Sequence, residues 1–261
     1  MDKIAAPAPL RLGPAPGLAA QVYTARRPLH GEDRALLLWL HGGSFTNGSL
    51  EATRARGELL AEAGADVVAL DYLLAPEHPF PAGLGAAFEA LQALAARPAK
   101  LTGSASTALF VAGEEAGGNL AAALALMARD QRAPTLAGQL LVSPMLDPAL
   151  GSASMRDGEC GGCECIYAKG WQAYLGDGIR ADHPYAAPLN STRLAGLAPA
   201  LVLSLAGHPL NDESRRYAAA LRRHGGAATE RTVTALEPAQ VLNPIHEFLR
   251  EAARRALSLS A

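Results

Sequence analysis

The sequence predicts an α/β protein with a mostly parallel central sheet that is covered by helices on both faces. Short apolar runs alternate with longer segments of helical periodicity along the chain, and the apolar runs are continuous instead of alternating with polar residues. Alternating strands and helices are typical of a parallel sheet, and continuous apolar strands are typical of a sheet that is buried on both faces. The 261 residues are compatible with one domain, 1–261.

The expected strands are apolar runs of four to eight residues, several of them rich in Val and Leu. They are Ala35–Leu40, Asp66–Leu70, Ala108–Ala112, Gln139–Ser143 and Ala200–Leu205, with one more around Thr232–Leu236. The expected helices are Glu51–Ala63, Leu84–Ala96, Gly118–Arg129, Asp212–Arg223 and Ile245–Leu257. In Asp212–Arg223 the apolar Tyr217 and Leu221 share one face while the arginines share the other, as in an amphipathic helix.

Two segments depart from this alternation. Residues 1–17 are rich in proline and lack the apolar run of a signal peptide, so we interpret them as a lead-in. Residues 148–189 are rich in Gly, Cys, Trp and Tyr and fall where α/β sheets often carry an insertion. We therefore expect 148–189 to form a cap or lid within the single domain.

Composition limits the partners. The formal net charge of −2 gives no reason to expect nucleic acid or an anionic membrane as a partner. No stretch of 18 apolar residues is present, so we expect no spanning helix and a cytoplasmic location. Cys160, Cys163 and Cys165 are too few and too clustered for a disulfide framework, and no fourth ligand for a structural zinc is evident. We expect no metal and no cofactor.

Four short motifs stand at or near the ends of expected strands. They are HGGS at 41–44, DYLLAPEHPFPA at 71–82, GEEAGGN at 113–119 and GHPLNDES at 207–214. Together they resemble the signatures of the hormone-sensitive-lipase group of carboxylesterases, which has the α/β-hydrolase fold. By this resemblance 71–82 has a mainly structural role, in which it braces the loops around the site.

The resemblance also implies site residues. Gly42, Gly43 and Ala116 match positions whose N–H groups form the family's oxyanion hole. Residues 113–119 match its nucleophile elbow, where a strand turns sharply into a helix, but Glu115 stands in place of the serine. His208 stands where the family has the aspartate that orients the catalytic histidine.

The third member of the family's triad, a histidine, is expected between Pro238 and Val241, where this chain has none. Gln240 is the nearest polar residue. We expect His246 to open the C-terminal helix; a place in the site after a loop insertion is the alternative. Gln240, His246 and Asn119 are the candidate supporting residues around Glu115.

A Ser-His-Asp triad needs a hydroxyl, a base and a carboxylate that orients the base, and these substitutions remove all three. Glu115 could fill the oxyanion hole itself, act as a base, or act as a nucleophile. Our leading hypothesis is a non-hydrolytic acid–base enzyme, of lyase, isomerase or cyclase type, acting on a small apolar carbonyl or ester compound. Glu115 and His208 would then share a proton.

Two alternatives remain open on the sequence alone. The chain could be a catalytically inactive protein that binds a small molecule, as hormone receptors of this family do, or a diverged carboxylic ester hydrolase. Either has a small-molecule ligand. Dimers are common for this fold, so a homodimer is a further open alternative.

Overall fold

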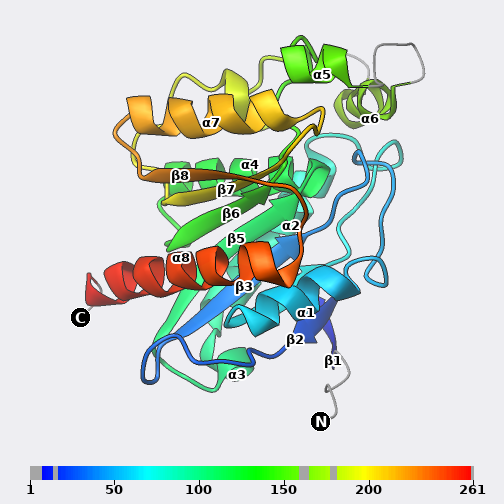
Figure 1. Ribbon diagram of the computed structural model, residues 1–261. Coiled ribbons are helices and arrows are strands. Elements are labelled where there is room, and N and C mark those ends of the chain that lie inside the picture. Colours follow the sequence, from blue (N-terminus) through cyan, green and yellow to red (C-terminus); the bar gives the residue numbers. More distant parts are fainter. Residues whose placement is uncertain (1–7, 14–16, 159–164, 177–180, 260–261) are drawn as a thin grey trace.

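The computed structural model describes residues 8–13, 17–158, 165–176 and 181–259. An eight-stranded sheet in the order β1-β2-β4-β3-β5-β6-β7-β8 runs through its centre (Figure 1). The strands are β1 Ala8–Leu12, β2 Leu18–Tyr23, β3 Arg34–Leu40, β4 Ala65–Leu70, β5 Thr107–Glu114, β6 Gly138–Val142, β7 Ala200–Leu205 and β8 Ala228–Val233. The six strands from β4 to β8 in this order are parallel, whereas β1 and β2 are antiparallel to their neighbours.

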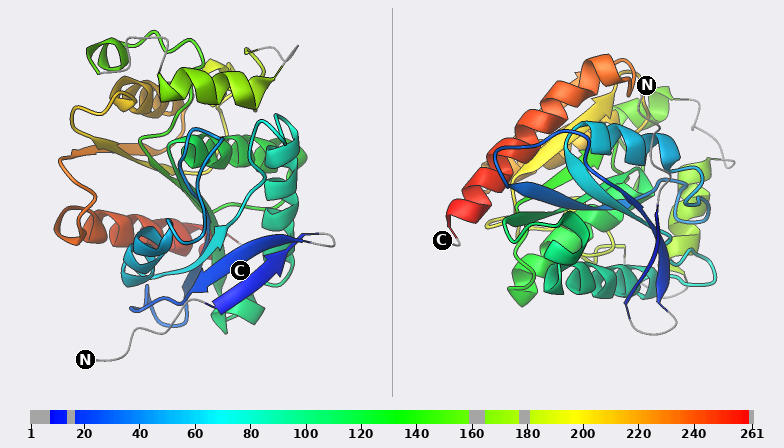
Figure 2. Two further views of the ribbon diagram at one scale, coloured as in Figure 1. Left: turned by 90° about the vertical axis from the view of Figure 1, so that its right-hand side faces the viewer. Right: turned by 90° about the horizontal axis from the view of Figure 1, so that it is seen from below.

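Helices cover both faces of the sheet, and this explains why the central strands are apolar throughout (Figure 2). The longer helices are α1 Arg54–Glu62, α2 Ala82–Ala96, α4 Ala116–Gln131, α6 Ile166–Leu175, α7 Asn211–Arg223 and α8 Pro238–Ser258. The short ones are α3 Ala99–Thr102, α5 Ala153–Asp157 and the 3-10 turn η1 Pro188–Asn190. One core packs α2, α4 and α7 against the sheet, and a second packs α1 and α8 against its other face.

The structure confirms the predicted α/β class and corrects the prediction at both ends of the chain. The N-terminal lead-in contains β1, and β2 follows it; short, half-exposed strands near the edge of a sheet leave little apolar signal. β8 ends at Val233, earlier than predicted. Its residues are mostly polar and exposed, so no apolar run marks its position in the sequence. Helix α8 begins at Pro238 instead of Ile245, since proline is well tolerated in the first turn of a helix.

The segment interpreted as a cap contributes α5, α6 and η1. Helices α5 and α6 lie beyond the carboxyl ends of the parallel strands (Figure 1). Cys165, the residue before α6, is a buried free thiol. Cys160 and Cys163 lie outside the described residues. None of the helices in the described ranges is long and apolar enough to cross a membrane.

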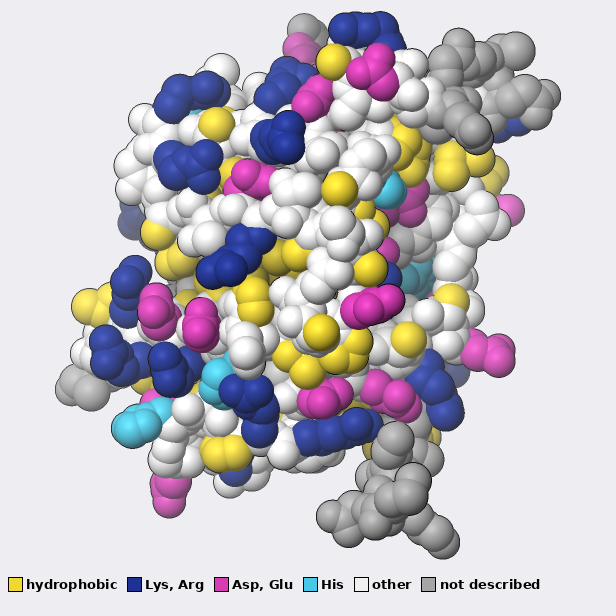
Figure 3. All heavy atoms as spheres, viewed as in Figure 1, with side chains coloured by type: hydrophobic (Ala, Val, Ile, Leu, Met, Phe, Trp, Pro, Cys, Tyr) yellow, Lys and Arg dark blue, Asp and Glu magenta, His cyan; other side chains and the backbone are white. Residues whose placement is uncertain are grey.

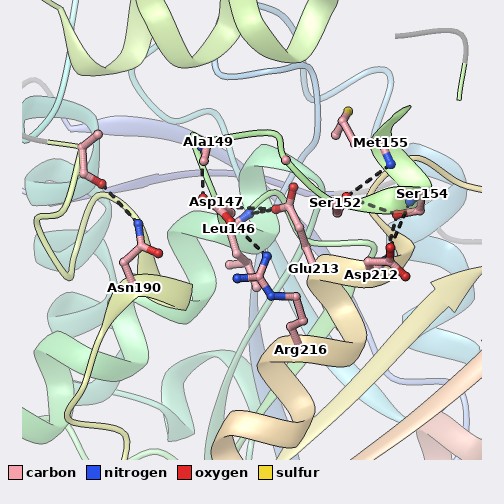
Figure 4. A network of polar contacts seen from close by, with 12 residues as sticks. Leu146, Asp147, Ala149, Ser152, Ser154, Met155, Asn190, Asp212, Glu213 and Arg216 are labelled. Atoms are coloured by element: carbon pink, nitrogen blue, oxygen red, sulfur yellow. Dashed lines mark hydrogen bonds and ion pairs between the residues drawn. The ribbon is translucent and has the colours of Figure 1, made fainter. Parts of the chain in front are cut away.

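Glu213 ties α7 to the chain that leaves β6 (Figure 4). Its side chain is fully buried, and one carboxylate oxygen, Oε2, accepts hydrogen bonds from the amides of Leu146 and Asp147. Asp147 is in turn paired with Arg216 at 3.0 Å, and Asp212 accepts a bond from the amide of Ser154 at 2.9 Å. Burial raises the pKa of Glu213 from 4.5 to about 7 against the effect of the two amides.

Glu213 should make stability depend on pH. Because its pKa is higher in the folded chain than in the unfolded one, the stability linked to its protonation is complete below pH 4.5. That stability is lost as the pH rises through 7, by about 3 kcal/mol at most. Urea unfolding of wild type and Glu213→Gln should therefore show the wild type losing free energy of unfolding relative to the variant between pH 5 and pH 8. A difference that is constant over this range would contradict the raised pKa.

Candidate functional site

The site is built on a sharp turn between β5 and α4. Glu115, the single residue between them, has φ 54° and ψ −116°, a strained conformation for a residue with a side chain. Its amide donates to the Val142 carbonyl and its carbonyl accepts from the Met145 amide, both at 3.0 Å. The chain beyond β6 therefore holds this turn in place.

The turn also requires glycine two residues before and two residues after Glu115. A Cβ atom at Gly117 would overlap the carbonyls of Leu40 and His41, and one at Gly113 would overlap the backbone of Gly117. The first turn of α4 thus lies directly against the end of β3. This close approach brings Glu115 next to the loop that follows β3.

The Glu115 carboxylate occupies the donor groups of that loop. Its Oε2 accepts from the amide of Gly43 at 2.6 Å and of Ser44 at 3.3 Å, and its Oε1 accepts from the Ser44 hydroxyl at 2.7 Å. Gly43 was predicted as a donor and Ser44 was not. The amides of Gly42 and Ala116, predicted from the resemblance, make no hydrogen bond to this carboxylate.

Residues of the 71–82 segment brace the same loop. The Tyr72 hydroxyl donates to the His41 carbonyl at 2.9 Å, and the Tyr72 ring stacks on the His41 ring with centroids 4.3 Å apart. His41 Nδ1 lies 2.7 Å from the Gly42 carbonyl, and burial lowers the pKa of His41. A neutral ring that donates from Nδ1 to this carbonyl holds the loop in the shape that receives Glu115.

A cavity of about 320 Å³ opens between Glu115 and His208. Figure 3 shows histidine and acidic side chains together in a recess below α6, next to hydrophobic side chains. The cavity is lined by the ends of four strands together with α1, α6 and the loop after β3, namely Trp39, His41, Gly42, Gly48, Ala52, Thr53, Arg56, Glu114, Glu115, Ser143, Ile166, Tyr167, Leu205 and His208.

An ion pair borders this cavity. Arg56 of α1 lies 2.9 Å from Glu114, the last residue of β5, and both side chains are partly exposed. The motif alignment placed Glu114 beside the apex of the turn, but nothing in the sequence identified Arg56 as its partner. Arg56 balances the charge of Glu114, and the charge of Glu115 is left to the hydrogen bonds of the β3 loop.

His208 shares the cavity with Glu115, but no direct hydrogen bond joins them. The oxygens of Glu115 are taken by Gly43 and Ser44, and His208 Nδ1 accepts a hydrogen bond from the Leu210 amide at 3.2 Å. Burial lowers the pKa of His208, although the negative charges of Glu115 and Glu114 oppose this shift. The direct contact predicted between the two side chains is therefore not formed.

The three candidate supporting residues do not line the cavity. Gln240 lies in the first turn of α8 and bonds Thr234. His246 lies inside α8 instead of opening it, is buried, and has Nδ1 2.9 Å from the Ala63 carbonyl. Asn119 lies buried in the first turn of α4, where it donates to the carbonyls of Met145 and Ala186 at 2.9 Å, so it fixes the loops around the turn.

Comparison with known proteins agrees with this fold. Residues 37–237 match the alpha/beta hydrolase fold family. The carboxylic ester hydrolase LipN of Mycobacterium tuberculosis is 35% identical over 86% of this chain and 61% of its own length. An esterase of Acinetobacter venetianus is 35% identical over 70% of this chain and 59% of its own length. The chain thus spans about three fifths of the length of these curated relatives.

Solved structures have the same fold. A bacterial heroin esterase superposes with a TM-score of 0.84 at 27% identity, over 95% of this chain and 84% of its own. The esterase EstE5, from a crystal soaked with p-nitrophenyl butyrate, gives a TM-score of 0.81 at 29% identity, over 97% of this chain and 87% of its own.

The contact between α4 and β3 predicts a large effect of a small substitution. Gly117→Ala should lower the free energy of unfolding by at least about 2 kcal/mol, because the added methyl group has no room against the Leu40 carbonyl. Gly85→Ala in α2 is the matched control, since a Cβ atom there meets nothing within 4 Å, and alanine should stabilise that helix by about 0.5–1 kcal/mol. Chemical denaturation measures both variants, and equal effects would contradict the close approach.

Proposed function

The chain belongs to the alpha/beta hydrolase fold family, and we propose that it is a carboxylesterase-like protein that binds small carboxylic esters without turning them over through a serine nucleophile. One observation carries this proposal. The Glu115 carboxylate occupies the amide of Gly43, one of the three donors expected to stabilise a tetrahedral oxyanion in acyl transfer, together with the neighbouring amide of Ser44. A carboxylate in this place prevents the substrate from using them.

The hypothesis of a non-hydrolytic lyase, isomerase or cyclase is wrong. The relatives are named as a carboxylic ester hydrolase, esterases and a carboxylesterase, and the superposed structures are esterases. These names indicate ester chemistry as the background of the scaffold. The chemical class of the ligand is therefore taken from the esterases.

A serine mechanism lacks support at each of its three positions. The apex of the turn carries a carboxylate, and the nearby Ser44 hydroxyl already donates to it. His208 accepts from a backbone amide on Nδ1, so its neutral ring has no free lone pair with which to act as a base. His246 is engaged with the Ala63 carbonyl inside α8.

The cavity suits a small ester. Its volume of about 320 Å³ is at the lower end of the range for small-molecule pockets. Ile166, Tyr167 and Leu205 supply an apolar side, and Ser143 and His208 supply polar groups. Such a combination would bury an acyl or alkyl chain while it orients the polar ester group.

Hydrolysis through Glu115 is the second candidate function. The hydrolase names of the relatives favour it, and Glu115 borders the cavity, where a carboxylate can take a proton from a water that attacks an ester. This mechanism forms no acyl-serine. It can therefore be separated from a serine mechanism by covalent labelling and from simple binding by turnover.

With p-nitrophenyl butyrate as substrate, the purified protein should release p-nitrophenol hardly faster than buffer. It should not be labelled by a fluorophosphonate probe, because the apex of the turn carries a carboxylate and the neighbouring Ser44 hydroxyl is bonded to it. Turnover that Glu115→Gln reduces by roughly 10²-fold or more, without labelling, would establish the second candidate instead. Labelling of any serine near the turn would overturn both.

Replacing the carboxylate by a hydroxyl should not create an esterase. Glu115→Ser frees the Gly43 and Ser44 amides but supplies neither a base nor a group to orient one, so p-nitrophenyl butyrate turnover should stay at the level of Glu115→Ala. Because residues of a triad act as a unit, one restored member recovers little activity. A rate for the serine variant that is more than about 10²-fold above that of the alanine variant would contradict this expectation.

A further inference from the structure

The cavity between Glu115 and His208 contains hydrogen-bond donors outside the β3 loop. Ser143 follows β6 and His208 lies in the loop after β7, and these two strands are neighbours in the sheet. The Ser143 amide donates to the Leu203 carbonyl at 2.8 Å, which fixes Ser143 to the end of β7. Both side chains line the same cavity.

The Ser143 hydroxyl has a proton for which the described residues supply no acceptor. Its Oγ accepts a hydrogen bond from the Leu205 amide at 3.3 Å, and within the described part of the chain no acceptor contacts its O–H. The residue is 2% exposed and has φ 39°, a conformation that side chains rarely adopt. Strained residues of this kind gather at binding and catalytic sites. A nearly buried hydroxyl next to a cavity gains most from a ligand that accepts its proton.

His208 supplies a second donor. The Leu210 amide donates to Nδ1, so the neutral ring carries its proton on Nε2. Burial lowers the pKa of His208 and favours this neutral form. No other hydrogen bond joins this ring to the described residues, and Nε2–H is thus available to a ligand in the cavity.

The charges around the cavity select against anions. Glu115 and Glu114 both border it, and Arg56, the arginine among the described lining residues, is already paired with Glu114. A ligand carboxylate would lie beside the uncompensated charge of Glu115 in a partly desolvated site, where like charges repel strongly. A neutral carbonyl oxygen can accept from Ser143 and His208 without this repulsion.

We propose that Ser143 and His208 form a relocated carbonyl-binding site, which holds the carbonyl oxygen of a neutral ester while the charge of Glu115 excludes the corresponding carboxylate. The inference rests on the proposed ester ligand and deepens it. The ester carbonyl binds away from the Gly43 and Ser44 amides, so it is not polarised by the donors that promote acyl transfer. The site thereby separates an ester from the acid that its hydrolysis would give.

Ethyl butyrate and sodium butyrate are the matched probes, titrated into the protein by calorimetry or ligand-observed NMR. Wild type should bind the ester at least about tenfold more tightly than the anion. Ser143→Ala and His208→Ala should each weaken ester binding about 3- to 10-fold, the scale of one lost hydrogen bond. His208→Gln, which keeps a donor, should retain more affinity than His208→Ala. Glu115→Gln should raise butyrate affinity about tenfold.

Ser204→Ala is the control for Ser143→Ala, because Ser204 is also buried but bonds Glu230 and does not line the cavity; it should leave ester binding unchanged. No binding of ethyl butyrate by wild type would overturn the proposed function itself. Ester binding that both alanine variants retain in full would overturn only the carbonyl site, and equal binding of ester and anion would overturn the exclusion.

Should Ser143→Ala fail to fold, isotope-edited infrared spectra of wild type with carbonyl-labelled ethyl butyrate decide the question. The bound carbonyl band should move to lower frequency than in an aprotic solvent. It should move back in His208→Ala. A band at the aprotic position in wild type would overturn the assignment.

Discussion

The hydrogen bond from the Gly43 amide to the Glu115 carboxylate, at 2.6 Å, joins the loop after β3 to the turn between β5 and α4. The Ser44 amide and hydroxyl reinforce it. Hydrogen bonds to a charged group contribute about 1.5–3 kcal/mol each, so three donors compensate much of the desolvation of one carboxylate. A loop whose donors suit an oxyanion suits a carboxylate for the same reason, because both present a negative oxygen. The shape and the charge of the neighbouring cavity follow from this contact.

Because Glu115 occupies the hydrogen-bond donors of the loop after β3, a ligand in the cavity interacts with the residues of the other walls. Four strand ends converge there, as is usual for ligand sites at the carboxyl ends of parallel strands. Arg56 neutralises Glu114, and the neutral rings of His41 and His208 add no positive charge. The cavity therefore combines one excess negative charge with neutral donors. This pairing favours an uncharged acceptor over an acid.

The sequence predicted the central fold and the turn but not the arrangement of side chains around them. Continuous apolar strands leave a signal that a single sequence can show, and the resemblance of residues 113–119 to the family's nucleophile elbow placed Glu115 at the apex. Which amide Glu115 reaches depends on small differences in distance between neighbours, so the sequence did not identify Ser44 as a donor to Glu115 beside Gly43. A direct hydrogen bond between Glu115 and His208 is not formed for a related reason, since each finds a nearer backbone partner.

Strain at Glu115 is consistent with a site that does not perform acyl transfer. A residue with φ 54° persists only where surrounding contacts determine its conformation. Here the Val142 carbonyl and the Met145 amide hold the backbone, and the side chain is held by Gly43. The two backbone bonds need no nucleophile at the apex, and they act equally whatever side chain the apex carries. The packing of α4 against β3 therefore determines the turn. The chemistry at the apex depends on the side chain that the turn presents to the cavity.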